Sequence, residues 1–390
     1  MRKSFRFKLF QNHRKNNKLR RELWVFCQIY NHSLALIKRH YKIFGKNPTK
    51  NNLQKHLKRL MDRGLHPEWK ELGYSQGIQE VTDRIYKSYD AFFKWCKIKK
   101  GVRKSPPKFK PFRKYKSFTL KQAGWKLEEE NGRILIGKTW FRYNKSRNIQ
   151  GVPKTLNIKR DPVGDWFITI SCDLGDDFIP EKIAPRTGQS AGFDFGLKCF
   201  LISNDGEEHA SGTFLKANLN ELRRRSSKFS KKIKGSKNRK KAGKSLARLH
   251  RKIADKRLDS HFKLALDLIR TYDNLFFEDL NLNGMKKLWG RKVSDHAFAT
   301  FMKIIEFKAT EHKKTIHKVD RFYPSSKTCS NPKCGHVKKE LTLKERVFVC
   351  DKCGLKIPRD LNASINIHRE GASSLGLGGV SPDLGLVFAV

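Results

Sequence analysis

The sequence predicts a mixed α/β chain of several domains, and three observations lead to that prediction. Its 390 residues allow roughly two or three domains. Runs of β-branched and aromatic residues alternate with long segments in which apolar residues recur every three or four positions, so both strands and helices are expected. Four of the eight cysteines lie within a short segment near the C-terminus, which indicates a small metal-binding module.

The charge of the chain points to a nucleic-acid partner. Lys and Arg number 85 against 37 Asp and Glu, which gives a formal net charge of +48. Apolar residues make up 38%, enough to build cores, so a disordered basic tail is excluded. No stretch approaches the ~18 uninterrupted apolar residues of a membrane span, and Lys8 and Gln11 break any signal peptide. The most economical partner is a nucleic-acid backbone. Ribosome-like packaging and adhesion to an anionic membrane are the alternatives.

The N-terminal half is expected to contain a sheet interrupted by helices. Residues 4–10 alternate apolar and basic side chains, as a strand does. Helical periods begin near Lys18 and again after Ser75, so a helical block of about 18–100 is expected. A basic, proline-rich loop follows, and residues 117–175 have the composition of strands. The first short strand is expected to join that sheet.

The C-terminal half is expected to hold a second sheet and further helices. A β-meander begins at Ser190 and turns at the sequence NDG. One long basic helix follows, with nineteen Lys and Arg against three acids between Lys216 and Lys263. Its thin apolar stripe consists of Leu246, Leu249, Ile253 and Leu258. A strand, a helix, a strand, the cysteine cluster and a last helix complete the fold, and the tail from Gly371 is expected to be disordered.

Three acidic residues stand out, because so basic a chain has few acids within apolar strands. Asp194 lies in GFDFGLK, with Phe193 and Phe195 on the opposite face, and the adjoining glycines would leave room for a metal and a phosphate. Glu278 ends the apolar run LFFE, and Asp360 begins the final helix. In isolation each has a structural explanation, as a turn acid, a strand-end acid and a helix-N-terminal acid.

The order of these acids along the chain favours a shared site. An acid in the first strand of a meander, one at the tip of a later strand and one on a last helix is the layout of the RNase H-like nucleases. Carboxylates are the ligands that Mg²⁺ takes in proteins. Two such ions about 4 Å apart can activate a water and stabilise the leaving 3′-oxygen in phosphodiester hydrolysis. Asp279 points away from Glu278 in an extended strand and is interpreted as a structural acid.

The cysteine spacing predicts a structural zinc site. Cys329-x4-Cys334-x15-Cys350-x2-Cys353 supplies four thiolates, a closed tetrahedral set. A glycine after the second cysteine of each pair permits the tight turn that two ligands of one ion require. Four unrelated buried thiols would not explain this spacing. The first pair is looser than the usual x2, so Cys329 is expected to be the weakest ligand. A reducing compartment is expected rather than a secreted disulfide scaffold.

These features together resemble the TnpB family, transposon-encoded RNA-guided nucleases related to type V CRISPR effectors. The matching segments are FRFKLF, LWVFCQIYNHSL, GFDFGLKCFLISNDG, FFEDLNL, FYPSSKTCS and CDKCGLKIPRDLNASINI, which cover nearly the whole chain apart from the tail. The resemblance implies a split β-barrel wedge domain (1–17 and 106–187), a helical recognition domain (18–105), a RuvC-like nuclease (188–324 and 357–370) of RNase H-like fold, a zinc-ribbon insert that binds target nucleic acid (325–356), and a tail (371–390).

The resemblance also implies an activity. Asp194, Glu278 and Asp360 would be the catalytic residues and would hold two Mg²⁺ ions, beside one structural Zn²⁺. A monomeric protein would bind a guide RNA derived from the transposon end, recognise a short target-adjacent motif and cut both strands of target DNA. A prokaryotic cytoplasm, at the nucleoid during action, is the expected location. The first cysteine pair departs from the family by two extra residues. Many relatives have an acid where this chain has Pro358, which leaves Asp360 the only acid in that segment.

Two other classes of function stay open. One is a guide-free, structure-selective nuclease such as a junction resolvase, which usually needs a symmetric dimer, and no dimer seam is evident in the sequence. The other is a catalytically idle DNA-binding regulator, against which the presence of all three acids argues.

The guide RNA is expected to lie along the basic helical and wedge surfaces, read by shape and phosphate while base pairing reads sequence. Seven cations of the basic helix are expected to contact nucleic acid: Arg223, Arg224, Arg225, Lys231, Lys232, Lys240 and Lys241. Four aromatic residues among basic neighbours could stack on bases, although such residues more often belong to a core: Phe92, Phe93, Trp95 and Tyr115.

Overall fold

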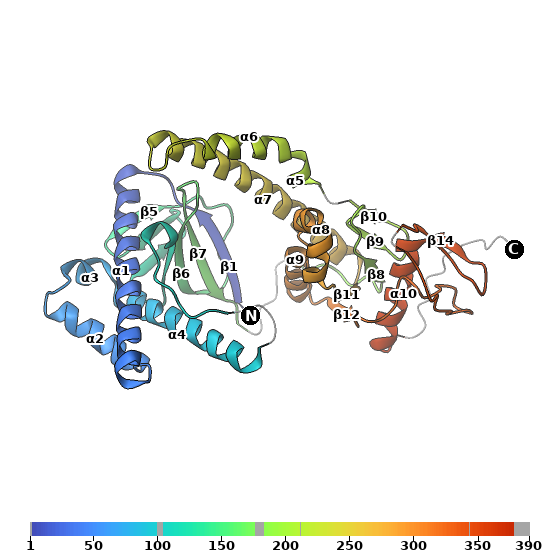
Figure 1. Ribbon diagram of the computed structural model, residues 1–390, viewed down its shortest axis with the longest axis horizontal. Helices are drawn as coiled ribbons and strands as arrows, with labels where there is room; N and C mark the ends of the chain where they lie inside the picture. Colours follow the sequence, from blue (N-terminus) through green and yellow to red (C-terminus); the bar gives the residue numbers. More distant parts are fainter. Residues whose placement is uncertain (1, 100–103, 176–182, 211, 343, 378–390) are drawn as a thin grey trace. The chain divides into compact units, whose positions relative to one another are not determined.

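A computed structural model describes residues 2–99, 104–175, 183–210, 212–342 and 344–377 (Figure 1). The chain divides into two compact units, Met1–Phe178 and Ile179–Val390. Both units mix helices with strands, as the sequence predicts. Within the described ranges, none of the helices combines the length and the apolar character that a bilayer crossing would need.

The first unit contains two antiparallel sheets. One has the strand order β1-β7-β6-β2 and consists of β1 (Arg2–Lys8), β2 (Ser117–Leu120), β6 (Val152–Arg160) and β7 (Trp166–Asp173). The other consists of β3 (Trp125–Glu128), β4 (Arg133–Ile136) and β5 (Thr139–Arg142), and a bridge from Leu9 to Tyr143 adjoins it. β1 pairs with β7 along its whole length, so the prediction that the first strand joins the later ones is confirmed. The closed barrel and the domain boundaries stay predictions.

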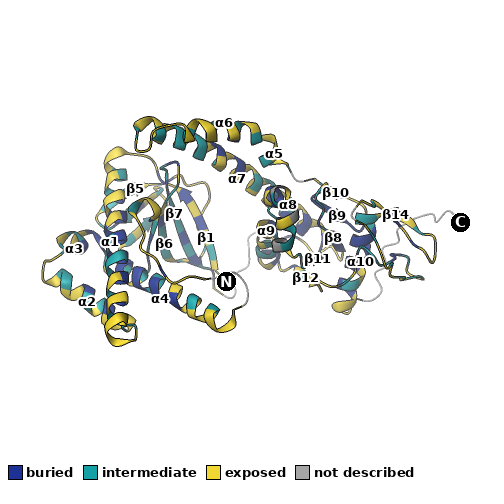
Figure 2. Ribbon diagram, in the orientation of Figure 1, coloured by how far each residue is buried: buried dark blue, intermediate teal, exposed yellow. Residues whose placement is uncertain are grey.

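Helices follow β1 in the first unit: α1 (His13–Phe44), α2 (Lys50–Asp62), α3 (Pro67–Leu72) and α4 (Ser75–Ile98), then a short 3-10 helix η1 (Phe112–Lys114). The predicted helical block is therefore confirmed. α1 begins after Asn12, whose side chain accepts a hydrogen bond from the Lys15 N–H, and ends at Gly45 in the left-handed conformation. α1 and α4 each bury one stripe and expose the opposite face (Figure 2). Towards their C-terminal ends the stripes give way to exposed residues, Tyr41 on α1 and Cys96 on α4.

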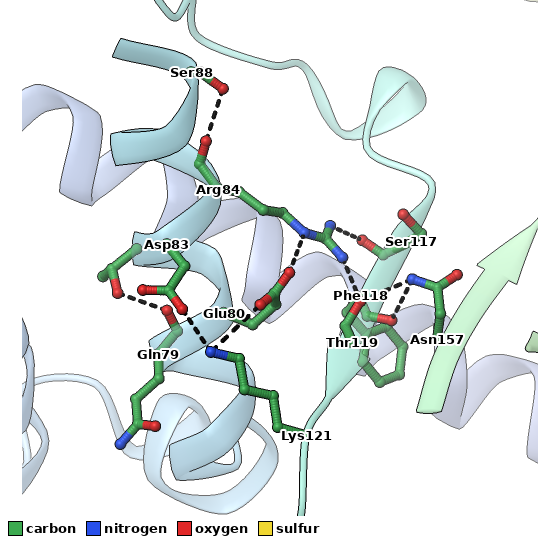
Figure 3. Close-up of polar contacts among 11 residues, drawn as sticks. Gln79, Glu80, Asp83, Arg84, Ser88, Ser117, Phe118, Thr119, Lys121 and Asn157 are labelled. Carbon is green, nitrogen blue, oxygen red and sulfur yellow. Dashed lines mark hydrogen bonds and ion pairs between the residues drawn. The ribbon is translucent and has the colours of Figure 1, made fainter. Parts of the chain in front are cut away.

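Charged side chains fix α4 to the neighbouring strand β2 (Figure 3). The Arg84 guanidinium donates to the Ser117 carbonyl oxygen at 3.0 Å and to the Thr119 hydroxyl at 2.6 Å. The adjacent Asp83 accepts a hydrogen bond from Lys121, just beyond β2, at 2.5 Å. Because charge-assisted hydrogen bonds are directional as well as strong, they set the position of the helix along the strand more narrowly than apolar packing does.

An ionisable residue lies within the buried stripe of α1. Glu22 is fully buried, and the Tyr74 hydroxyl donates to its Oε1 at 2.9 Å. The second carboxylate oxygen has no hydrogen-bond partner among the described residues. Burial raises the pKa of Glu22 to about 7, although the Tyr74 hydrogen bond and the charge of Lys18 oppose the rise. Gly137 gives the Tyr74 hydroxyl its space, because a Cβ there would collide with that group.

We expect Glu22→Gln to stabilise the protein above neutral pH. The folded-state pKa of about 7 exceeds the ordinary 4.5, so the stabilising contribution of the protonated carboxyl is complete below pH 4.5 and is lost as the pH rises through 7. At pH 8 the buried carboxylate should cost about 3 kcal/mol, which the neutral amide avoids. Thermal unfolding of the full chain at pH 5, 6.5 and 8 measures the difference, with the exposed Glu130→Gln as control. Identical pH profiles for wild type and Glu22→Gln would contradict the expectation.

The second unit contains a five-stranded sheet in the order β10-β9-β8-β11-β12. β8 (Ser190–Asp194), β9 (Leu201–Ser203) and β10 (Glu208–His209) form the predicted antiparallel meander. β11 (Asn274–Glu278) pairs in parallel with both β8 and β12 (Thr315–Val319). The rings of Phe193, Phe195 and Phe277 pack together on one face, where α9 (Phe298–His312) covers them. α10 (Arg359–Ser374) packs on the strands β8, β9 and β11.

The prediction of one long basic helix is wrong, because that segment forms an antiparallel pair of helices. After the short α5 (Phe214–Ala217), α6 (Leu219–Ser230) and α7 (Lys237–Thr271) are joined by a turn with Gly235 in the left-handed region. The Ser236 side chain caps α7 by accepting from the Arg239 N–H. The Arg239 guanidinium donates back to carbonyl oxygens at the end of α6. Leu258, predicted on the apolar stripe, is exposed. A further helix, α8 (Leu282–His296), precedes α9.

The last helix extends further than predicted. α10 continues through Gly371 to Ser374, so the residues at the start of the expected disordered tail are helical. Gly371 is buried where α10 crosses β11, and a Cβ there would collide with the ring of Phe276. The glycine therefore permits close packing and does not mark disorder. The remainder of the tail, 378–390, lies outside the described residues.

Candidate active site and metal centre

Two of the predicted acids leave the same end of the second sheet. β8 and β11 are neighbouring parallel strands, in which Phe193 is paired with Phe277. The next residue of each strand is acidic, Asp194 on β8 and Glu278 on β11. Because parallel neighbours end at a common edge, these two carboxylates start from adjacent backbone positions.

The third acid reaches them through the packing of α10 on β8. A Cβ on Gly192 would collide with the backbone of His368 and would lie 2.5 Å from the Ser364 carbonyl oxygen, so strand and helix touch at this glycine. Asp360 lies one turn before Ser364 on the same helix face. Asp194 lies two residues after Gly192 on the same strand face. This packing therefore brings Asp360 towards Asp194.

The glycines beside Asp194 do not have the role predicted for them. The space next to Gly192 is taken by the backbone of α10. A Cβ on Gly196 would lie 2.5 Å from the Cys199 carbonyl oxygen, in the turn that follows the strand. Both glycines thus allow the chain to approach itself, and the interpretation that they leave room for a metal and a phosphate is wrong.

The three carboxylates influence one another electrostatically. Burial raises the pKa of Asp194 well above its ordinary value, and the charges of Glu278 and Asp360 raise it further, against the opposing charge of Arg359. Burial also raises the pKa of Glu278. Such a repulsive set of oxygen ligands is what a divalent cation would stabilise, so the donors fit Mg²⁺. The acids are less tightly gathered than the four cysteines. Among the described residues, the cysteines are the only group of three or more His, Cys, Asp or Glu side chains close enough to hold one metal ion, with all ligand atoms within 4.8 Å.

The neighbouring acid has a separate partner. Asp279 forms an ion pair with Arg321, whose Nε also donates to the Asp279 carbonyl oxygen at 3.1 Å. This contact agrees with the interpretation of Asp279 as a structural acid.

Ser325 is a site residue that the sequence analysis missed. Its side chain is buried, and its hydroxyl donates a hydrogen bond to Glu278 Oε1, which lowers the pKa of that carboxyl against the larger effect of burial. Asn366 of α10 holds the same segment by donating to the Ser325 carbonyl oxygen at 2.9 Å. The available signal was the pair Asn362 and Asn366, two polar residues one helical turn apart in the segment NASIN.

The helix that carries Asp360 also holds the first cysteine. Asn362 donates to the Thr328 carbonyl oxygen at 2.8 Å and accepts from the Ser330 N–H at 3.0 Å. Cys329 lies between those two residues. The cysteine segment and α10 are therefore joined by hydrogen bonds on both sides of this thiol.

The four predicted cysteines come together. Cys329 Sγ lies 3.6 Å from Cys353 Sγ, and Cys334 Sγ lies 3.7 Å from Cys350 Sγ. Zinc–sulfur bonds of about 2.3 Å in a tetrahedron require sulfur–sulfur distances of about 3.8 Å, so the geometry fits Zn²⁺. The Leu355 N–H is the main cause that lowers the pKa of Cys353 to about 7, which favours the thiolate.

The cysteine module has a small core of its own. Its hairpin consists of β13 (Val347–Val349) and β14 (Lys356–Pro358). Phe348 and Ile357 of the hairpin pack with Cys329 and with Ile365 of α10. Cys329 is completely buried there, and its sulfur lies within 4.8 Å of the other three cysteine sulfurs. The structure therefore gives no reason to rank it as the weakest ligand.

Some of the cations predicted to contact nucleic acid form ion pairs or hydrogen bonds within the protein, and most of them are exposed. Arg224 and Arg225 both pair with Glu221, and Arg225 also donates to the Ser245 carbonyl oxygen at 2.9 Å. A cavity of about 450 Å³ between α6 and α7 is lined in part by Arg225, Lys232 and Lys241. The exposed members are Arg223, Arg224, Lys231, Lys232, Lys240 and Lys241.

The aromatic candidates differ in exposure. Tyr115 is buried in the core of the first unit and its ring has no face free for a base. Phe93 is exposed, while Phe92 and Trp95 are half-buried. Among these four, Phe93 alone retains the accessible ring that stacking needs.

Two family models match the second unit and the end of the first. The OrfB_IS605 model, described as "Probable transposase", matches residues 170–288. The Cas12f1-like TNB domain model matches residues 298–367. The first match includes Asp194 and Glu278, and the second includes Asp360 and all four clustered cysteines.

Several curated proteins are similar over long stretches. A "Putative RNA-guided DNA endonuclease" of Streptomyces pristinaespiralis is 26% identical over 98% of this chain and 92% of its own length. The "Putative RNA-guided DNA endonuclease InsQ" of Escherichia coli K12 is 25% identical over 80% of this chain and 78% of its own. A Mycobacterium tuberculosis protein with the same description, Rv2885c, is 34% identical over 46% of this chain and 41% of its own.

Solved structures resemble the chain weakly. A Cas12f1–sgRNA–target DNA complex aligns with a TM-score of 0.34 and 18% identity over 94% of this chain and 99% of the other. CasPhi-2 (Cas12j) bound to crRNA and phosphorothioate-DNA aligns with a TM-score of 0.49 and 10% identity, over 95% and 91%.

Proposed function

Because this chain belongs to the TnpB family, we propose that it is an RNA-guided DNA endonuclease. The observation that supports the proposal most is the approach of Asp194, Glu278 and Asp360 from three distant segments of the sequence. They leave adjacent strand ends and a helix start, and the charges of Glu278 and Asp360 raise the pKa of Asp194. Acids with a purely structural role gain nothing from like-charged neighbours, so a cluster of three acids in so basic a chain is typical of a functional site.

The three carboxylates would hold two Mg²⁺ ions, which when bound would supply Lewis-acid activation of water and stabilisation of the leaving oxygen. The carboxylates must be ionised to bind the ions, so acid pH should oppose loading. Ser325 would keep the Glu278 carboxylate oriented. The four cysteines would hold one Zn²⁺ in a closed site with no open position, so its contribution would be structural.

The partners we propose are a guide RNA and a target DNA duplex. With a net charge of +48, the positively charged side chains would repel one another and destabilise the compact protein in the absence of bound anions. RNA phosphates would neutralise it, with release of condensed counterions. Base pairing with the guide would then select the DNA, so the protein itself would read only backbone shape and a short adjacent motif.

The decisive experiment expresses the protein together with the noncoding DNA downstream of its gene. One discrete RNA should copurify and survive moderate salt, and this complex should cut a duplex that carries the matching target and adjacent motif. Scrambling the target should abolish cutting. A junction resolvase would instead cut branched DNA after complete ribonuclease treatment, and an idle regulator would bind the duplex without cutting. Heterogeneous, exchangeable RNA with cleavage independent of its sequence would refute the proposal.

We expect Ser325→Ala to weaken Mg²⁺ binding more than it weakens folding. The substitution removes the only side-chain group that donates a hydrogen bond to Glu278 among the described residues. The half-buried carboxylate oxygen is then left without that hydrogen bond. Loss of a hydrogen bond that orients a metal ligand typically lowers metal affinity 10–100-fold. The Mg²⁺ concentration for half-maximal cleavage should rise by a factor in that range, while thermal stability changes little.

Two variants control for other causes. Ser325→Thr keeps the hydroxyl and should restore the Mg²⁺ dependence. Ser326→Ala makes the same change at the adjacent residue, for which no side-chain hydrogen bond to Glu278 is present, and should behave as wild type. A Mg²⁺ profile that is identical in Ser325→Ala and wild type would show that Ser325 has no positioning role.

A further inference from the structure

Phe322 is the most exposed large apolar side chain among the described residues. Its side chain is 88% exposed. It lies in the turn between β12 and Ser325, and therefore beside the residue that donates to Glu278. A single exposed apolar side chain needs no explanation in general. Phe322 differs because contacts hold the residues on both sides of it, and because those residues lie next to the acids at the end of β11.

Contacts on both sides of Phe322 hold the backbone of the turn, while the Phe322 ring itself is left exposed. The Asp320 side chain accepts a hydrogen bond from the Phe322 N–H at 2.8 Å, and the Tyr323 N–H donates to the Asp320 carbonyl oxygen at 3.1 Å. Arg321 is paired with Asp279. Tyr323 packs on a buried cluster that includes Phe276. The backbone of Phe322 is thus held in place while its ring faces solvent.

The backbone of Phe322 lies close to the proposed nuclease site, because both Arg321 and Ser325 contact acids at the end of β11. Phe322 precedes Ser325 by three positions, so their Cα atoms are at most about 10 Å apart. That distance corresponds to about three base steps of 3.4 Å along a strand. On the other side, Arg321 binds Asp279, which lines a cavity of about 230 Å³ together with Glu278 and Lys303. A strand with its phosphodiester at Glu278 would therefore have a base within reach of the ring.

We propose that Phe322 stacks on a base of the DNA strand bound at Asp194, Glu278 and Asp360, which rests on the proposed function. A flat apolar ring binds the face of any base, because every base has a π-face. Such contact suits an enzyme whose target sequence is selected by RNA pairing, since the contact is tolerant of sequence. The DNA strand is the occupant because the turn is anchored to the two acids at the end of β11.

The first test measures stacking directly in a complex that cannot cut. Asp194→Ala protein with its guide RNA is bound to target duplexes that carry 2-aminopurine, whose fluorescence depends on stacking, at successive positions around the cut site. Emission at one or two neighbouring positions should change when Phe322→Ala is added. Phe322→Leu should match Phe322→Ala because it keeps apolar volume but has no π-face, whereas Phe322→Tyr should match Phe322.

The second test measures cleavage by complexes with an intact site. Phe322→Ala should lower the single-turnover rate by about 5- to 150-fold, the range for loss of one stacked base, without changing guided binding of the duplex. Thermal stability should be unchanged, because the ring is exposed. Phe322→Tyr should retain the wild-type rate.

The outcomes separate this inference from its premise. If wild-type protein does not cut guide-matched DNA, the proposed function fails. If wild type cuts and Phe322→Ala cuts equally fast, or no DNA position responds to residue 322, the function stands and the stacking inference is wrong. A fluorescence response only from 2-aminopurine placed in the guide RNA, or equal retention by Phe322→Leu, would also overturn it.

Discussion

Asp194→Ala, Glu278→Gln and Asp360→Asn should each abolish DNA cleavage and leave guided DNA binding nearly intact. Each substitution removes one negative charge from a set that would neutralise two divalent ions, and Mg²⁺ has few other ligands to compensate. We expect rates to fall by at least about 10³-fold, comparable to the loss of other groups that act as a unit. Binding energy comes from many dispersed cations, so it should be almost unaffected. Cleavage and gel-shift assays on the same preparations separate the two effects.

Asp279→Asn is the matched control for Glu278→Gln. The two acids are adjacent, but Asp279 is paired with Arg321 while Glu278 accepts from Ser325. The control should cut within a few-fold of wild type, since Arg321 still donates to the carbonyl oxygen of residue 279 and only an exposed ion pair is weakened. An inactive Asp279→Asn together with an active Glu278→Gln would show that Asp279, and not Glu278, is the catalytic acid.

The elements of this fold follow from local patterns where one face is buried. The alternation of residues 4–10 predicts β1, and the recurrence of apolar residues from Leu19 to Ile37 predicts the buried stripe of α1, because in both cases burial selects the pattern directly. The division between α6 and α7 escaped prediction for the same reason. Both helices are mostly exposed and basic, so no apolar pattern changes at the turn, and only Gly235 and Ser236 mark it.

The acids could be chosen from the sequence, but their environment could not. Asp194, Glu278 and Asp360 stand out because acids are rare in apolar strands of so basic a chain. The role of Gly192 depends on α10, which lies more than 160 residues later in the chain, and the role of Ser325 depends on a strand end. Such contacts arise from tertiary packing, which no local period encodes.

Removal of one zinc ligand should have effects beyond the cysteine module. Elemental analysis should find one zinc per chain, and Cys329→Ser or Cys350→Ser should lose it. Structural zinc sites contribute about 10–16 kcal/mol to the folding of small zinc domains, so the loss should unfold the module. The sequence spacing alone ranked Cys329 as the weakest ligand. Its complete burial leads us to expect Cys329→Ser to be at least as damaging as Cys350→Ser.

The damage should spread to the acids because α10 is shared. Asn362 and Asn366 bind the backbone on both sides of Cys329, and the same segment contains Ser325, which holds Glu278. Hydrogen exchange should therefore accelerate in residues 325–366 of Cys329→Ser, and cleavage should be lost along with zinc. Cys199→Ser, which changes a cysteine outside the cluster, should retain the zinc and the activity, and hydrogen exchange in residues 325–366 should remain as slow as in wild type. A zinc-free preparation that still cuts at the wild-type rate would show that the module and the catalytic acids are independent.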